Sequence, residues 1–97
     1  MSTEIDWTGT WETNYGKVEL QQTGNTVTGS YMIKQGRIDG IVLGNELSGK
    51  WSEAPSYAPP NDAGEFVIRM DKSGISFKGM WWKLAPLSEK EWSGRRV

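Results

Sequence analysis

Trp7-Thr8-Gly9-Thr10-Trp11 is the first copy of a pattern that runs through the chain: a large apolar residue, then any residue, glycine, any residue, and another large residue. The pattern returns in five further segments, the last with a charged end: Val27-Thr28-Gly29-Ser30-Tyr31, Ile38-Asp39-Gly40-Ile41-Val42, Leu47-Ser48-Gly49-Lys50-Trp51, Phe77-Lys78-Gly79-Met80-Trp81 and Trp92-Ser93-Gly94-Arg95-Arg96. Side chains alternate between the two faces of a β-strand, so the three marked positions of each copy share one face. The repeat therefore predicts strands with one apolar face.

Composition supports β structure and narrows the chemistry. The 97 residues favour one domain over residues 1–97, and six Trp and twelve Gly in so short a chain are typical of β proteins. The chain has no Cys and no His, so it lacks disulfides, thiolates, the commonest general base and the commonest metal ligand. We expect neither a metal site nor a cofactor.

Charge and hydropathy exclude two classes of partner. The formal net charge of −1 is unlike the basic footprint of a nucleic-acid-binding protein. No apolar run approaches the roughly 20 residues of a membrane-spanning helix. The start of the chain, residues 1–6, is acidic and lacks the apolar core of a signal peptide. We expect a cytoplasmic protein with no nucleic-acid or membrane partner.

Eight strands follow from the alternation of apolar and polar residues. The expected ranges are 7–13, 17–22, 26–33, 37–43, 46–53, 64–70, 75–83 and 92–97. The first four connections that contain glycine fit two-residue hairpin turns, in which Gly or Asn takes positive φ: Tyr15-Gly16, Gly24-Asn25, Gln35-Gly36 and Gly44-Asn45. Asp71-Lys72-Ser73-Gly74 is typical of a type I turn closed by glycine.

These turns fix an expected register for each hairpin. The expected pairs are Thr13 with Val18, Trp11 with Leu20, Gln22 with Val27, Leu20 with Gly29, Ile33 with Ile38, Tyr31 with Gly40, Val42 with Leu47, and Gly40 with Gly49. Directly paired residues share a face, so every hairpin keeps its apolar residues together, and a one-residue slip would invert them. The agreement predicts an antiparallel meander.

A meander with one apolar face must bury that face. Closing the eight strands into an up-and-down barrel does so and removes the sheet edges. We therefore predict an all-β fold, an eight-stranded antiparallel up-and-down meander closed into a barrel; a two-sheet sandwich with the same pattern is the alternative. Interior glycines let strands coil and make room for large neighbours. Gly40 is expected to lie between the rings of Tyr31 and Trp51.

The connections divide such a barrel into two different ends. The tight turns at 24–25, 44–45 and 71–74 fall at one end, which we call the closed end. The longer loops expected over 54–63 and 84–91 fall at the other, the open end, and loops of this kind often carry function. A structural cap is expected at the closed end, with the Arg96 guanidinium over the indole of Trp7 or Trp11.

Nine inward-facing residues in the open half form the candidate site: Trp11, Thr13, Tyr31, Ile33, Trp51, Glu53, Trp81, Lys83 and Trp92. Their aromatic rings either line a cavity for a small apolar or aromatic molecule or fill the barrel completely, since eight-stranded barrels do both. Glu53 and Lys83 either orient a polar ligand group, act as an acid–base pair, or are ordinary solvated residues at strand ends.

These segments resemble the calycin superfamily of lipocalin, fatty-acid-binding and avidin-type barrels. Such barrels carry Gly-x-Trp on the first strand and an Arg or Lys on the last, matched here by Gly9-x-Trp11 and by Arg96 or Arg95. The avidin-type pattern is the closer one and covers Thr8-Gly9-Thr10-Trp11, Thr28-Gly29-Ser30-Tyr31 and Leu47-Ser48-Gly49-Lys50-Trp51. The resemblance implies a small ligand-binding barrel.

The biotin site of avidins does not carry over to this chain. Thr13 stands where avidins place Asn, Lys17 where they place Ser, and Ile33 where they place a small polar residue. Only Tyr31 clearly survives from that site, so the resemblance implies that this protein does not bind biotin.

Three functions from different classes remain open. The first is a small-molecule-binding barrel, the second an isomerase or cyclase that mainly shapes its substrate, and the third a filled structural or protein-interaction module. Several apolar residues are expected on the outer face: Met32, Ile41, Val67, Met80 and Trp82. If they form a contiguous patch they mark an interface, so a homo-oligomer is also left open.

Overall fold

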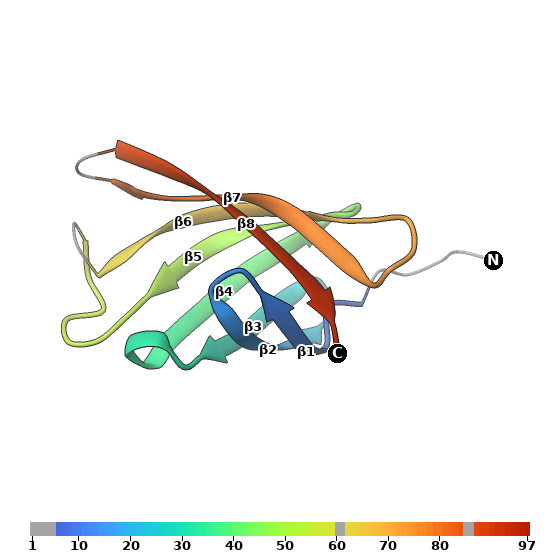
Figure 1. Ribbon diagram of the computed structural model, residues 1–97, viewed down its shortest axis with the longest axis horizontal. Helices are drawn as coiled ribbons and strands as arrows, with labels where there is room; N and C mark the ends of the chain where they lie inside the picture. The colour runs from blue at the N-terminus through green and yellow to red at the C-terminus, as the bar shows by residue number, and fades with distance from the viewer. Residues whose placement is uncertain (1–5, 60–61, 85–86) are drawn as a thin grey trace.

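The structure, a computed structural model, describes residues 6–59, 62–84 and 87–97 (Figure 1). It contains eight strands and one short 3-10 helix. In chain order these are β1 (Gly9–Thr13), β2 (Gly16–Thr23), β3 (Thr26–Tyr31), η1 (Ile33–Gln35), β4 (Gly36–Leu43), β5 (Glu46–Ser52), β6 (Ala63–Met70), β7 (Ser76–Leu84) and β8 (Leu87–Arg96).

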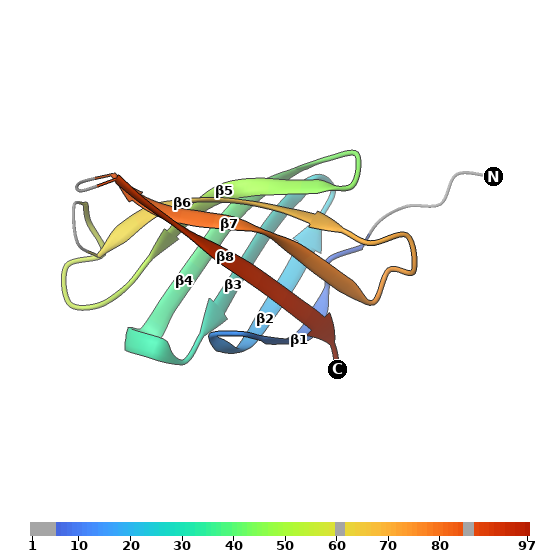
Figure 2. The same cartoon turned by 45° about the horizontal axis from the view of Figure 1, so that its top comes forward.

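The strands form a closed antiparallel barrel in which each strand pairs with the next and β8 pairs with β1. Closure sets Trp11 opposite Arg96 and Thr13 opposite Gly94. The turned view in Figure 2 shows β8 crossing the barrel to reach β1, so that the C-terminus lies near the start of the first strand. The predicted up-and-down barrel is confirmed, and the sandwich alternative is wrong.

Two of the predicted hairpin registers are confirmed. Gln22 pairs with Val27, and Val42 pairs with Leu47. In both hairpins the glycine of the turn takes positive φ, 63° at Gly24 and 64° at Gly44. The Gly-Asn dipeptide fixed these turns because its glycine adopts a backbone conformation that most residues avoid.

Two other predicted registers are wrong, each by an even number of residues. Trp11 lies opposite Val18 rather than Leu20, because the turn residues are Asn14 and Tyr15. Tyr31 lies opposite Gly36 rather than Gly40, because residues 32–35 form a longer connection that contains η1. An even slip keeps every side chain on its own face, so the apolar pattern cannot detect it.

The slip between β3 and β4 changes which glycine each aromatic ring covers. Gly40 does not lie between Tyr31 and Trp51; it lies opposite Val27 on one side and Gly49 on the other. A Cβ on Gly36 would collide with the Tyr31 ring, and a Cβ on Gly64 would lie 2.8 Å from the Trp51 ring. Each of these large rings therefore rests on the glycine opposite it.

The final hairpin is longer than predicted. Strand β8 begins at Leu87 rather than at Trp92, and most of the loop expected over 84–91 instead pairs with β7. Residues 85–86 of that expected loop lie outside the described residues. Residues 89–91 are exposed, so this extension needs no apolar alternation, which is why the sequence resembled a loop there.

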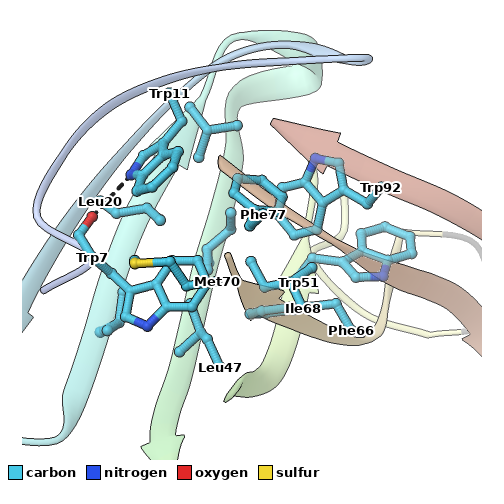
Figure 3. Packing of buried hydrophobic residues seen from close by; sticks show 13 residues of the cluster. Trp7, Trp11, Leu20, Leu47, Trp51, Phe66, Ile68, Met70, Phe77 and Trp92 are labelled. Atoms are coloured by element: carbon cyan, nitrogen blue, oxygen red, sulfur yellow. Dashed lines mark hydrogen bonds between the residues drawn. The ribbon is translucent and has the colours of Figure 1, made fainter. Parts of the chain in front are cut away.

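Thirteen buried apolar side chains form the core: Trp7, Trp11, Val18, Leu20, Val27, Ile38, Leu47, Trp51, Phe66, Ile68, Met70, Phe77 and Trp92. Phe77 joins its two halves, with ring centroids 5.3 Å from Trp11 and 5.5 Å from Trp92 (Figure 3). Within the described ranges, no helix is long and apolar enough to cross a membrane.

Candidate functional site

A cavity of about 230 Å³ lies in the open half of the barrel. Its lining comes from the β1–β2 turn, from η1 and from the open ends of five strands and the residue that follows β5. The lining residues are Tyr15, Val18, Tyr31, Ile33, Lys34, Trp51, Glu53, Trp81, Lys83 and Trp92. Trp92 and Val18 are buried, whereas Tyr15 and Ile33 are exposed, so the cavity runs from the core to the solvent.

Along one wall, the Trp81 ring stands nearly perpendicular to two neighbouring aromatic rings. Trp81 meets Trp51 edge to face, with centroids 5.4 Å apart and an interplanar angle of 84°. The Tyr15 ring meets Trp81 edge to face, with centroids 5.6 Å apart and an interplanar angle of 78°. The indole N–H of Trp51 donates to the Trp82 carbonyl at 3.3 Å, which fixes the orientation of the Trp51 ring. The cavity is therefore bounded by both ring faces and ring edges, a geometry that suits a flat apolar or aromatic guest.

A tyrosine–carboxylate pair supplies polar groups to the cavity. The Tyr31 hydroxyl donates a hydrogen bond of 2.6 Å to Oε2 of Glu53, which follows β5. Burial of the phenol, together with the hydrogen bond to Glu53 and the negative charge of that carboxylate, raises the pKa of Tyr31 well above its usual value. Tyr31 is therefore a protonated donor at neutral pH.

The mouth of the cavity is held by contacts between η1 and the loop after β5. The Ala54 amide donates to the Lys34 carbonyl at 2.8 Å, and the Tyr57 hydroxyl donates to the Gln35 carbonyl at 3.1 Å. The Arg37 guanidinium lies 4.2 Å above the Tyr57 ring. These contacts fix the position of η1, and with it Ile33 and Lys34, at the rim.

Hydrogen bonds also form within the loop that follows β5. The Glu53 amide donates to the Asp62 carbonyl at 2.7 Å, and the Ser56 hydroxyl donates to the Asp62 carboxylate at 2.7 Å. The Ser56 hydrogen bond, aided by the nearby charges of Lys34 and Lys83, lowers the pKa of Asp62. These hydrogen bonds hold Glu53 in position at the cavity.

Seven of the nine predicted site residues line this cavity: Tyr31, Ile33, Trp51, Glu53, Trp81, Lys83 and Trp92. Sequence reasoning missed three lining residues, Tyr15, Val18 and Lys34. The expected ranges place Tyr15 in a turn and Lys34 between the strand over 26–33 and the Gln35-Gly36 turn. Val18 points inward on β2, so the strand pattern could have identified it as a lining residue. The expected register paired it with Thr13, near the rim, whereas the structure pairs it with Trp11.

The other two predicted residues lie elsewhere. Trp11 is fully buried toward the closed end, where its indole N–H donates to the Trp7 carbonyl at 3.0 Å (Figure 3). Thr13 uses its hydroxyl within the first hairpin, donating to the Gly16 carbonyl at 2.6 Å. Neither residue lines the cavity, because β1 ends at Thr13 and Trp11 sits at the level of Arg96.

Arg96 covers Trp11 at the closed end. Its guanidinium carbon lies 4.3 Å over the Trp11 ring, and its three nitrogens donate to backbone carbonyls of Asp6, Thr8 and Gly74 at 2.6, 2.6 and 3.2 Å. The placement of Arg96 over an indole matches the expected cap, with Trp11 rather than Trp7 beneath the charge. Trp7 packs beside Trp11, with centroids 5.8 Å apart.

The residue types around the cavity favour holding a molecule in place. Apolar rings make most of the wall, while Tyr31, Glu53, Lys34 and Lys83 offer hydrogen bonds and charge near the mouth. In the part of the chain that the structure describes, no cluster of three His, Cys, Asp or Glu residues is arranged to hold a metal ion. No protein-family model, curated protein or solved structure matches this chain.

Proposed function

We propose that this protein is a calycin-like barrel that binds a small apolar or aromatic molecule in the cavity at its open end. The observation that carries the proposal is that Tyr15, Trp51 and Trp81 line an open cavity in one half of the barrel, with the Trp81 ring nearly at right angles to the other two. Concave, mostly apolar sites with a few convergent polar groups are the usual form of small-molecule sites.

The size of the cavity limits the ligand. A volume of about 230 Å³ is below the range of about 300–1,000 Å³ that is common for drug-sized ligands. A molecule with one or two rings fits this space, whereas a long acyl chain or a tetrapyrrole does not. The exposed rim at Ile33 leaves room for one substituent to reach the solvent.

The polar groups at the mouth orient that substituent. Glu53 has one carboxylate oxygen bonded to the Tyr31 hydroxyl, and its second oxygen, which accepts no hydrogen bond from the described residues, can accept one from a ligand hydroxyl or amine. Lys34 and Lys83 supply donors on the same rim. A ligand with a donor and an acceptor on one edge would donate to Glu53 and accept from one of the two lysines.

An isomerase or cyclase on the same barrel is the second candidate, and the Tyr31–Glu53 pair is the observation that favours it. The pair places a hydroxyl and a carboxylate side by side in the cavity, where the carboxylate of Glu53 is positioned to accept a proton from a bound substrate. Mass spectrometry of a molecule retained from expression separates the two functions. A ligand is released unchanged, whereas a substrate is converted to an isomer on incubation.

Titration with 4-nitrobenzyl alcohol, a neutral one-ring quencher of indole fluorescence, tests binding directly. We expect saturable quenching of the wild-type protein. Ile33→Trp should abolish it by filling the mouth, and Ile75→Trp is the matched control, since Ile33 and Ile75 are 46% and 47% exposed at opposite ends of the barrel. Quenching that is linear up to millimolar probe, or equally reduced in both variants, would contradict the proposed site.

A further inference from the structure

A row of uncharged side chains crosses the outer face of four neighbouring strands. Ile41 pairs with Ser48, Ser48 with Val67, and Val67 with Met80, so these residues lie side by side from β4 to β7. Ile41 is 60% exposed and Met80 36% exposed, and neither points into the barrel. We call these four residues the outer row.

The two rows that flank the outer row carry opposite charges at corresponding places on β5 and β6, and an indole and a cation on β7. On the open-end side, two residues along each strand, lie Lys50, Glu65 and Trp82 of β5, β6 and β7. On the closed-end side, on the same three strands, lie Glu46, Arg69 and Lys78. Each strand therefore presents a cation and an anion, or a cation and an indole, four residues apart.

We propose that two copies of this chain associate through this face, with the two-fold axis running along the outer row. Rotation about that axis brings the open-end side of one copy onto the closed-end side of the other, strand for strand. Lys50 then meets Glu46 of the second copy, Glu65 meets Arg69, and Trp82 meets Lys78. Each of these three contacts occurs twice, and all three are attractive. On β8, exposed Glu91 lies opposite Met80 at the end of the outer row, so the proposed contact ends at β7.

The geometry of sheets permits this arrangement. Two twisted sheets stack face to face with their strands inclined by about 30°, and the uncharged outer rows supply the contact along the axis. On β4 the flanking residues, Asp39 and Leu43, form no attractive pair, so β4 lies at the rim.

The size of the face sets the expected affinity. Ten residues, the four of the outer row and the six that flank it on β5, β6 and β7, take part, compared with the about 20–30 residues a side of a standard stable interface. We therefore expect a weak dimer, with a Kd on the order of micromolar and weaker at high salt, because rim charges are screened.

Sedimentation of two charge reversals, alone and mixed, tests the two-fold register. Lys50→Glu sets two pairs of carboxylates against each other, and Glu46→Lys sets two pairs of ammonium groups against each other, so each variant alone should be monomeric. An equimolar mixture should form a heterodimer at least as readily as the wild type, since every contact between positions 46 and 50 is again attractive. A wild type that stays monomeric at millimolar concentration, or a mixture that stays monomeric, overturns the proposal.

Within one copy, Lys50 also lies opposite Glu65 and Glu46 opposite Arg69, so each reversal perturbs its own sheet. Melting curves of the isolated variants measure that effect, and it cannot produce a heterodimer on mixing. Glu19→Lys, a reversal of equal size on the outer face of β2, is the control and should leave the wild-type dimer intact. Loss of the dimer in Glu19→Lys would also overturn the proposal, because it would show a response to net charge alone.

Discussion

The two ends of this barrel are built from the same kind of side chain and differ in what covers it. At the closed end, Trp7 and Trp11 are fully buried, because the Arg96 guanidinium spans Trp11 and binds the backbone of residues 6–8. At the open end, Tyr31 and Trp81 are only partly buried, and the space beside them is a cavity. At the closed end, Arg96 and the backbone it binds cover the aromatic rings, which therefore form part of the core. At the open end no such cover lies over the described rings, and a cavity remains beside them.

The largest expected effect is a difference in stability loss between truncating an aromatic ring at the closed end and truncating one at the open end. Trp11→Ala should lower the free energy of unfolding by about 3–5 kcal/mol, because it opens a void in a filled core. Trp81→Ala should cost less than about 2 kcal/mol, since one side of that ring already faces a cavity. Urea denaturation of both variants measures the difference. Equal losses would mean that the open end is as filled as the closed end.

Removal of the closed-end cover should have the next largest effect. Arg96→Ala loses three hydrogen bonds to carbonyls and the contact with the Trp11 ring, and we expect a loss of about 2–4 kcal/mol. Arg95 is exposed on the opposite face of β8, so Arg95→Ala should change stability by less than about 0.5 kcal/mol. Thermal melts of the two variants provide the comparison, and matching melting temperatures would show that Arg96 is not a cap.

Gly36 sharpens the comparison at the open end. Gly36→Ala places a methyl group against the Tyr31 ring and should cost about 1–3 kcal/mol while displacing the ring from Glu53. The same substitution in a Tyr31→Ala background should cost much less, since the ring it strikes is gone. A double-mutant cycle in urea measures the coupling. An equal cost in both backgrounds would place Tyr31 elsewhere.

The smallest effect concerns pH. The pKa of Tyr31 is raised in the folded state, so above the ordinary tyrosine pKa of about 10 the unfolded chain loses this proton while the folded chain keeps it. Stability contributed by Tyr31 is therefore complete below about pH 10 and declines as the pH rises further. Unfolding free energies between pH 8 and 11 should fall more steeply for the wild type than for Tyr31→Phe. Parallel curves would contradict a perturbed Tyr31.

The repeated pattern predicted the barrel but not every pairing within it. Alternation fixes the face of each residue, and the Gly24-Asn25 and Gly44-Asn45 turns fixed their hairpins because glycine there takes positive φ. Between β3 and β4 the positive φ values fall on Lys34 and Gln35, 50° and 51°, which carry no sequence signal for such a conformation. The connection through η1 was therefore invisible in the sequence.

The sequence predicted which residues of the candidate site point into the barrel. It did not predict how far along the barrel axis each of them lies. Tyr31, Trp51, Trp81 and Trp92 face inward in any even register, so the slips did not remove them. Trp11 also faces inward, yet the Arg96 contact places it at the closed end. Its level along the barrel depends on how β1 meets β8, a pairing between the two ends of the chain that local patterns do not specify.

The indole N–H signals of the six Trp residues report on both ends in one experiment. We would titrate ¹⁵N-labelled protein with 4-nitrobenzyl alcohol and follow each indole Nε1–H resonance. A hollow open end and a filled closed end predict that Trp51, Trp81 and Trp92 shift with one common saturation curve while Trp7 and Trp11 stay in place. Shifts at Trp7 and Trp11, or six unmoved resonances at millimolar probe, would contradict the division of this barrel into a core and a site.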